Sequence, residues 1–272
     1  MGRRVADRAR IMAESSSAPL QLLHVLEPVG EAMIQPSLAN LMWQHQTQEA
    51  EKLAEWTRQR SDVPVSLEVV KGSPSWELAV RGKTASVVVV GSSSIDAFSV
   101  GPVAKRVARK TVADTLVVRR QPRTSYRKII AAVDFSEHSR AAVNTGLTLF
   151  PAAEITALYS MPSRFDPLLA GAGLFKEELE ASRGARLGLA GERMEKFAAP
   201  WNGDIRTLVV DGPPTGTIEE VVRRRGADLV IVASRGASAT RMVLLGTVAE
   251  GLVTEAPCDV LVARSKAPFR RP

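Results

Sequence analysis

Short runs of consecutive apolar residues alternate with longer amphipathic stretches along most of this chain of 272 residues. In the C-terminal half, the apolar runs lie at 128–134, 155–160, 206–210, 228–232 and 259–263. They are rich in Val and Ile, which is typical of strands covered on both faces. The stretches between them predict helices at about 137–149, 174–198 and 215–225 and from residue 246 onward. Strands that alternate with helices form parallel crossovers, so we expect a doubly wound parallel α/β sheet in this half.

The same order of elements occurs twice along the chain. Four segments of the N-terminal half match four of the C-terminal half in order: 20–28 with 155–163, 65–80 with 206–222, 85–94 with 227–236, and 100–120 with 245–265. Four ordered matches with similar spacing predict a tandem duplication. The basic segment RRQPRTSYRK at 119–128 contains a proline and marks the join. We therefore expect two domains, at 1–121 and 122–272.

The N-terminal copy has no counterpart of the strand at 128–134. It opens on the helical pattern RRVADRARIMAE, and its first recognisable strand is LQLLHV at 20–25. Without the missing strand, the strands near 20–25 and 86–90 close up against each other or leave a gap. We expect a four-stranded first domain that is less stable than the second and has no adenine pocket. A start codon assigned too far downstream would account for the shortened N-terminus.

The composition is that of an ordinary globular protein, with 45% hydrophobic and 24% charged residues. No apolar run approaches the roughly 20 residues of a membrane-spanning helix, and the N-terminus lacks the apolar core of a secretory signal. The single cysteine, Cys258, cannot form an internal disulfide and fits a reducing compartment. The sequence predicts a cytoplasmic protein.

The formal net charge of +7 raises the question of nucleic-acid binding. Most basic residues are interspersed with acidic ones, and local groups occur only at 119–128, 223–225 and in the tail. The basic segments are not interleaved with aromatic residues as in RNA-binding modules. The pattern favours a surface that attracts small anions in general over a specific nucleic-acid interface.

A glycine-bearing loop follows the fourth strand of the C-terminal half. Gly236 is separated by nine residues from Gly246, which precedes Thr247 at a predicted helix start. Backbone N–H groups at a helix N-terminus attract phosphate, and glycine lets the main chain approach closely. Asp134 and Ser160 end two other strands, and the carboxyl ends of parallel strands are where such sheets bind ligands. The sequence therefore predicts a phosphate-binding site at this edge.

Three segments resemble a universal stress protein domain: IIAAVDFSEHSRAAV, ASRGASATRMVLLGTVAE and APCDVLVAR. The resemblance spans 126–264 and, more weakly, 2–120, so the whole chain resembles a tandem member of that family. It implies two Rossmann-like, adenine nucleotide alpha hydrolase-like domains, the first of which lacks the first strand. In the family's sheet that strand lies in the middle. ATP-binding members carry Gly, two residues, Gly, nine residues, then Gly-Ser/Thr in this loop. The resemblance thus implies ATP, with or without magnesium, as a regulatory ligand, and no structural metal.

The resemblance also implies roles for particular residues. Asp134 would contact the ribose or adenosine side, the backbone at Ser160 the adenine, and Gly236, Gly246 and Thr247 the phosphates. The full implied set is Ala132, Val133, Asp134, Ser160, Ala233, Ser234, Gly236, Gly246, Thr247 and Val248. Ala233 departs from the family pattern, because it stands where the first glycine would be. Its methyl group would crowd the ligand unless its backbone angles are ordinary.

Simpler structural roles compete with these. Gly236 is also suited to a turn, and Gly246 with Thr247 to a helix start capped by a hydroxyl. Asp134 opens DFSE, which reads as an Asp-x-x-Glu capping box. In the N-terminal half the loop is degraded: Ser94 replaces the second glycine, six residues separate it from Gly101, and Pro102 offers neither N–H nor hydroxyl. We expect no ATP binding there.

Other chemistries find little support. Asp134, Ser136 and His138 are close in sequence without forming a hydrolase triad, and no nucleophile elbow, dinucleotide fingerprint or Walker loop is present. The chain's three histidines (His24, His45 and His138) and Cys258 lack metal-ligand spacing. The sequence favours a binding protein with at most weak ATPase activity. The alternative is a nucleotide-free scaffold of the same fold that acts through partner binding and dimerisation.

The final strands of the two halves, at 115–120 and 259–263, are apolar and would be sheet edges. Natural proteins cover or pair such edges. We expect the two strands to pair inside one chain, with homodimerisation through other surfaces.

Overall fold

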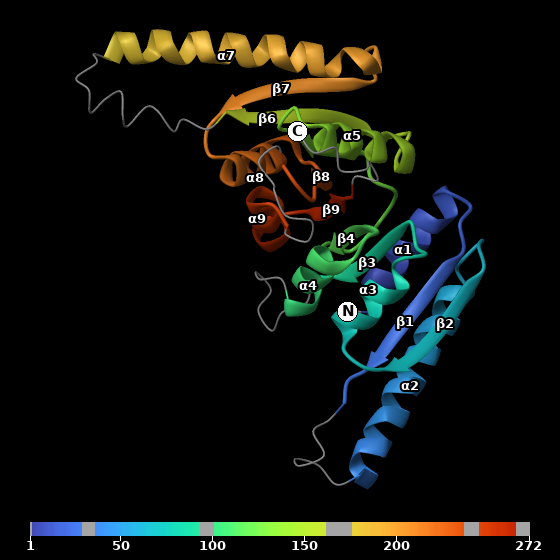
Figure 1. The fold of residues 1–272 in the computed structure, drawn as a ribbon. Coiled ribbons are helices and arrows are strands. Elements are labelled where there is room, and N and C mark those ends of the chain that lie inside the picture. Colours follow the sequence, from blue (N-terminus) through green and yellow to red (C-terminus); the bar gives the residue numbers. More distant parts are fainter. Residues whose placement is uncertain (1, 29–35, 93–100, 162–175, 237–244, 265–272) are drawn as a thin grey trace. The chain divides into compact units, whose positions relative to one another are not determined.

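The computed structural model describes residues 2–28, 36–92, 101–161, 176–236 and 245–264. Contacts divide the chain into two compact units, residues 1–125 and 126–272. Each unit alternates strands and helices (Figure 1).

The second unit has the elements that the apolar pattern predicts. In chain order they are β5 (Lys128–Ala132), α5 (Glu137–Leu149), β6 (Glu154–Met161), α7 (Lys176–Ala198), the 3₁₀ helix η1 (Ala199–Trp201), β7 (Ile205–Asp211), α8 (Pro214–Arg225), β8 (Leu229–Ala233), α9 (Thr247–Glu255) and β9 (Asp259–Ala263). All ladders within this unit are parallel, in the order β9-β8-β5-β6-β7. The first strand of the unit, β5, therefore lies in the middle, and the chain direction across the sheet reverses between β5 and β8. This switch point is where an open parallel sheet binds ligands.

Close packing of α5 on this sheet fixes the start of the helix near the switch point. The five residues of β8 are all buried, as expected for a strand covered on both faces. Gly146 lies on the face of α5 toward this strand, where an added Cβ would stand 2.7 Å from Cδ1 of Ile231. A glycine at this position lets the helix backbone approach the sheet more closely than any larger residue would.

The first unit has two separate ladders. Its elements are α1 (Gly2–Ser15), β1 (Leu20–Leu26), α2 (Pro36–Arg58), β2 (Val65–Lys71), α3 (Pro74–Arg81), β3 (Val87–Gly91), α4 (Pro102–Lys110) and β4 (Asp114–Val118). Among its described residues, β1 pairs with β2 and β3 with β4, in parallel, and the two pairs belong to different sheets. Helix α1 packs against both β1 and β3. The described part of this unit thus opens on a helix and contains four strands; that the domain is cut short at its N-terminus stays a prediction.

The duplication is visible in the backbone at equivalent glycines. After the equivalent strands β2 and β7, Gly72 and Gly212 adopt φ values of 156° and 144°, which side chains rarely allow. Before the fourth helix of each unit, Gly101 and Gly246 occupy the N-cap with φ, ψ of −60°, 155° and −64°, 153°. The two halves therefore share their turn geometry as well as their element order.

The residues just before the first pair of glycines carry opposite charges. Lys71 ends β2, and its Nζ lies 3.8 Å from the ring centroid of Trp43 on α2. Asp211 ends β7, where its Oδ2 lies 2.5 Å from Nε of Arg183 on α7, and its side chain is only 6% exposed. Each unit thus fixes its long helix on the edge strand by a different electrostatic contact.

His24 on β1 predicts a pH dependence for the first unit. Burial lowers the pKa of this imidazole, and its Nε2 has no hydrogen-bond partner in the described part of the chain. The unfolded chain therefore binds the proton more readily, so the free energy of unfolding is highest well above pH 6.5 and falls as the pH drops below about 6.5. We expect the urea midpoint, followed by tryptophan fluorescence, to fall between pH 8 and pH 5.5. Three of the four tryptophans, Trp43, Trp56 and Trp76, lie in this unit.

The control for this prediction is His24→Phe, which removes the titrating group. The variant should show a flatter pH dependence over the same range, while His45→Phe should behave as the parent chain does. An unchanged slope in His24→Phe would contradict the assignment.

Candidate functional site

Asp134 follows β5 at the carboxyl edge of the sheet and is fixed by the turn into α5. Its Oδ1 accepts hydrogen bonds from the N–H of Ser136 at 3.1 Å and from the hydroxyl of Ser136 at 2.5 Å. Ser136 is itself the N-cap of α5 and accepts from the N–H of Ser139 at 3.1 Å. The interpretation of Asp134 as the helix cap is therefore wrong, because a serine two residues later occupies that position. The carboxylate instead orients the turn and remains at the edge of the sheet.

Gly236 provides the space that this carboxylate occupies. A Cβ added at Gly236 would stand 2.8 Å from Oδ2 of Asp134, closer than real contacts allow. The backbone of Gly236 does not lie in the left-handed region. The residue is thus required for close approach rather than for an unusual turn angle. Since β5 and β8 are neighbours, the loop after β8 is brought directly against Asp134.

The start of α9 closes the other side of this arrangement. The N–H of Gly246 donates to the carbonyl of Ser234 at 2.9 Å, and an added Cβ would lie 3.7 Å from both the nitrogen of Gly236 and that carbonyl. Gly246 is the N-cap of α9, so a helix does begin here, but Thr247 follows the cap and does not provide it. The side chain of Thr247 is exposed. The first N–H groups of α9 lack partners within the helix, as at any helix start.

Ala233, the departure from the glycine pattern, sits in ordinary strand geometry. It is the last residue of β8, pairs with Ala263, and is not in the left-handed region. The next residue, Ser234, continues the ladder by donating its N–H to the carbonyl of Ala263 at 2.9 Å. An alanine at this position therefore costs no backbone strain.

The remaining predicted residues lie along the same edge. Ser160 on β6 is buried, and its hydroxyl donates to the carbonyl of Gly212 at 2.7 Å, so its side chain is engaged in holding the strand end. Ala132 ends β5, Val133 donates its N–H to Leu158, and Val248 is the second residue of α9. The structure brings all ten predicted residues to the carboxyl edge of one unit, and the intervening residues 237–244 lie outside its described part.

A model of the universal stress protein family matches this chain twice, at residues 2–119 and 125–264. The chain belongs to the universal stress protein family. A universal stress protein of Methanocaldococcus jannaschii is 31% identical over 143 residues, which covers 51% of this chain and 82% of that protein. A second one from the same organism is 26% identical over 156 residues, covering 52% of this chain and 96% of that protein.

Solved structures of universal stress proteins show the same fold. One from Archaeoglobus fulgidus has a TM-score of 0.69 at 14% identity, with 95% of this chain and 91% of that chain covered. A putative member from Pseudomonas aeruginosa has a TM-score of 0.60 at 16% identity, with 89% and 92% covered. Two tandem universal stress protein domains thus make up this chain, and its family is one of stress-response proteins.

One feature of this universal stress protein's site was missed by sequence reasoning. Phe135, next to Asp134, adopts a φ of 64°, which costs a residue with a side chain roughly 1–2 kcal/mol. Aromatic contacts hold it there: its ring centroid lies 4.3 Å from that of Tyr159 on β6 and 5.8 Å from that of Phe197 on α7. The guanidinium of Arg193 lies 4.7 Å from the ring on another side. This cluster fixes the turn that carries Asp134.

The equivalent loop of the first universal stress protein domain offers fewer donors. Pro102 is the first residue of α4, after the N-cap Gly101, and proline has no N–H. The predicted defect at Ser94 lies outside the described residues.

Two further observations concern the described part of the chain as a whole. It contains no group of three or more His, Cys, Asp or Glu side chains that could hold a metal ion. None of its helices has the length and apolar composition needed to cross a membrane.

Proposed function

We propose that the second unit binds one adenine nucleotide, with ATP as the main ligand, and that this ligand is regulatory in the stress response. The observation that supports this is the close approach of Asp134 and Gly236, which follow the neighbouring strands β5 and β8, with the start of α9 closed against the same loop. The two glycines, Gly236 and Gly246, leave space beside N–H groups that lack partners within the helix, which suits phosphate.

In this proposal each residue contacts the part of the nucleotide that its position at the carboxyl edge allows. Asp134, tied to Ser136 through Oδ1, contacts the ribose or adenosine side. The buried hydroxyl of Ser160 is engaged with Gly212, so this residue meets the adenine through its backbone. The backbones of Gly236 and Gly246 and the exposed hydroxyl of Thr247 hold the phosphates. Magnesium, where it takes part, is carried by the phosphates.

Calorimetric titration of the full chain with ATP at physiological salt tests this proposal. We expect one ATP per chain that AMP displaces, because the first unit has Pro102 at the equivalent helix start. Two displaceable nucleotides per chain would show that the first unit is competent as well. Absence of binding would contradict the proposal and favour a nucleotide-free scaffold of the same fold.

We further propose that β4 and β9 pair inside one chain and that the chain dimerises through other surfaces. Each of these strands lies at the edge of the ladders formed within its own unit, and apolar edges are normally covered. Hydrogen exchange measures this directly: the amides of β9 should be protected in the full chain and exposed in residues 122–272 alone at low concentration. Rapid exchange of β9 in the full chain would contradict the pairing, and sedimentation of the full chain reports the dimer.

A further inference from the structure

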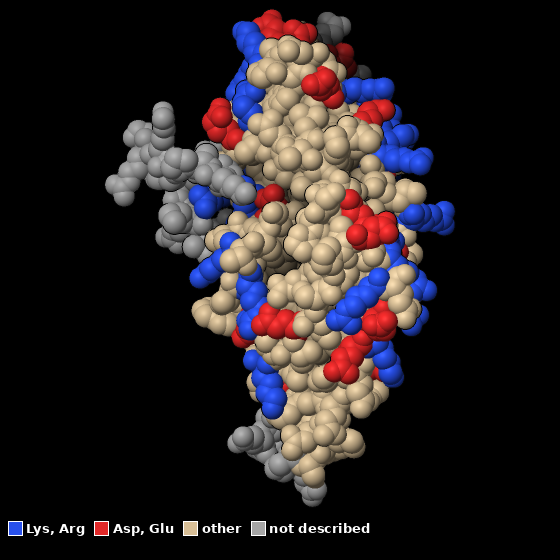
Figure 2. All heavy atoms as spheres, turned by 90° about the vertical axis from the view of Figure 1, so that its right-hand side faces the viewer, with Lys and Arg blue, Asp and Glu red and all other residues tan. Residues whose placement is uncertain are grey.

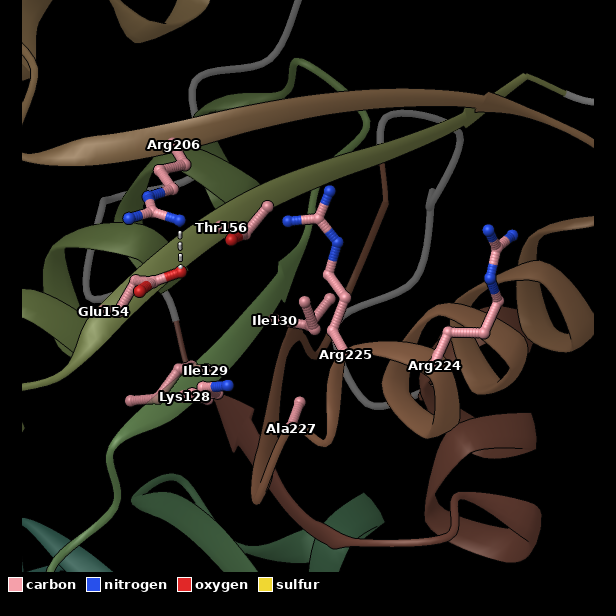
Figure 3. Close-up of a pocket in the computed structure, with 9 residues that line it drawn as sticks. All are labelled: Lys128, Ile129, Ile130, Glu154, Thr156, Arg206, Arg224, Arg225 and Ala227. Carbon is pink, nitrogen blue, oxygen red and sulfur yellow. Dashed lines mark ion pairs between the residues drawn. The ribbon is translucent and has the colours of Figure 1, made fainter.

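A cavity of about 350 Å³ lies at the amino end of the strands in the second unit, opposite the edge that carries Asp134 (Figure 3). Its floor is apolar apart from one hydroxyl and is formed by Ile129, Ile130, Thr156 and Ala227, each at most 3% exposed. Its rim is charged and consists of Lys128, Arg206, Arg224, Arg225 and Glu154. The proposed nucleotide site uses none of these residues.

The rim has a clear excess of positive charge. The lining contains four cations and one carboxylate. That carboxylate is already occupied, since Oε1 of Glu154 lies 2.9 Å from Nη1 of Arg206. Lys128 and Arg225 have no ion pair with any described residue. In Figure 3 Arg225 extends toward Thr156, whereas Arg224 points away from the cavity. Like charges gathered around a hollow repel one another unless an anion neutralises them.

The helix dipole explains only part of this arrangement. Three arginines end α8, where cations offset the negative end of the helix. Arg223 and Arg224 are each paired one turn back, with Glu219 at 3.3 Å and Glu220 at 3.6 Å, and Arg225 is not. Lys128 is the first residue of β5 and Arg206 the second residue of β7, so they come from two separate strands. Neither of these strands nor helix α8 requires its basic side chain to lie at the same cavity as the other two.

We propose that this cavity binds a small anion that carries two or more phosphate groups. Its volume lies at the low end of small-molecule pockets, about 300–1,000 Å³. Guanidinium groups bind phosphate oxygens in a bidentate manner, and the hydroxyl of Thr156 adds a donor at the floor. On the face drawn in Figure 2, Lys and Arg lie interspersed with Asp and Glu.

Titration of the full chain with pyrophosphate tests this proposal, in low salt and with saturating AMP to occupy the nucleotide site. The double variant Lys128→Gln with Arg225→Gln should bind pyrophosphate about tenfold more weakly or worse, since it removes both unpaired cations. Glu154→Gln should bind it several-fold more tightly, because it removes the carboxylate and releases Arg206. The matched control is Arg223→Gln, which loses the same charge on the same helix outside the cavity and should change the affinity by no more than about twofold.

Three results would overturn the proposal. The first is that the parent chain fails to bind pyrophosphate. The second is that Arg223→Gln loses as much affinity as the double variant, which would indicate general attraction to a basic surface. The third is that a single-stranded oligonucleotide displaces pyrophosphate and binds the chain more tightly than pyrophosphate does, which would indicate a nucleic-acid surface. Gly246→Asp, at the opposite edge, should leave pyrophosphate binding intact, so that failure here and failure of the nucleotide proposal are distinguishable.

Discussion

Gly246→Asp is expected to abolish ATP binding by the second unit. The substitution puts a carboxylate at the N-cap of α9, beside Gly236 and Ser234, where the phosphates are proposed to bind. An aspartate is a favourable N-cap, and an added Cβ would meet its nearest neighbours at an ordinary 3.7 Å. The variant should therefore fold normally while its carboxylate competes with phosphate for the helix start. Calorimetry with ATP and with AMP measures the loss.

The matched control is Gly216→Asp in the first turn of α8. An added Cβ there meets nothing within 4 Å, so the same change of charge is made in the same unit, at the start of a different helix. This control should bind ATP as the parent chain does. A second variant, Gly236→Ala, leaves the net charge unchanged. It forces the carboxylate of Asp134 to move and should weaken ATP binding about tenfold or more. ATP binding that survives Gly246→Asp unchanged would refute the site.

Phe135→Ala is expected to lower the free energy of unfolding of the second unit by about 2 kcal/mol, and to weaken nucleotide binding. The change removes the ring that packs on Tyr159 and Phe197 while the residue still has to adopt a positive φ. Without the ring, the turn that orients Asp134 loses the aromatic contacts that hold Phe135 in its positive φ. Hydrogen exchange of β5 and β6 in increasing urea reports this unit separately from the first.

Comparison with Phe135→Gly separates the contribution of the aromatic contacts from that of the backbone strain at the positive φ. Glycine also removes the ring but adopts a positive φ without strain, so it should be about 1 kcal/mol more stable than alanine at this position. Both variants should bind nucleotide more weakly than the parent chain. Equal stability of the parent chain and Phe135→Ala would show that the aromatic cluster does not fix the turn.

The elements of the second unit could be predicted from the sequence because their signal is local. Runs such as those of β8 and β9 are uniformly apolar, and the breaks between them hold glycine or proline. The carboxyl-edge residues could be located for the same reason, since each follows a recognisable strand. The order of the strands, by contrast, came from the family resemblance.

The remaining features depend on contacts between distant parts of the chain. The choice of Ser136 over Asp134 as helix cap is decided by a turn in which Phe135 has a positive φ, and this in turn depends on α7. The cavity rim joins Lys128 with Arg206, 78 positions later, and Arg225, a further 19 positions later. In the first unit, the sequence left open whether the strands near 20–25 and 86–90 close up or leave a gap, and the structure has them in separate ladders.

The opposite charges of Lys71 and Asp211 have a consequence for the folding of a duplicated chain. Two similar halves in one polypeptide can exchange equivalent helices and become trapped in a misassembled state. If α7 docked on the first unit, Arg183 would face Lys71, and if α2 docked on the second, the ring face of Trp43 would meet Asp211. Both contacts are repulsive, because like charges repel and the face of an aromatic ring is electronegative. Each half therefore disfavours the long helix of the other at this contact, and divergence at two equivalent positions favours the correct pairing.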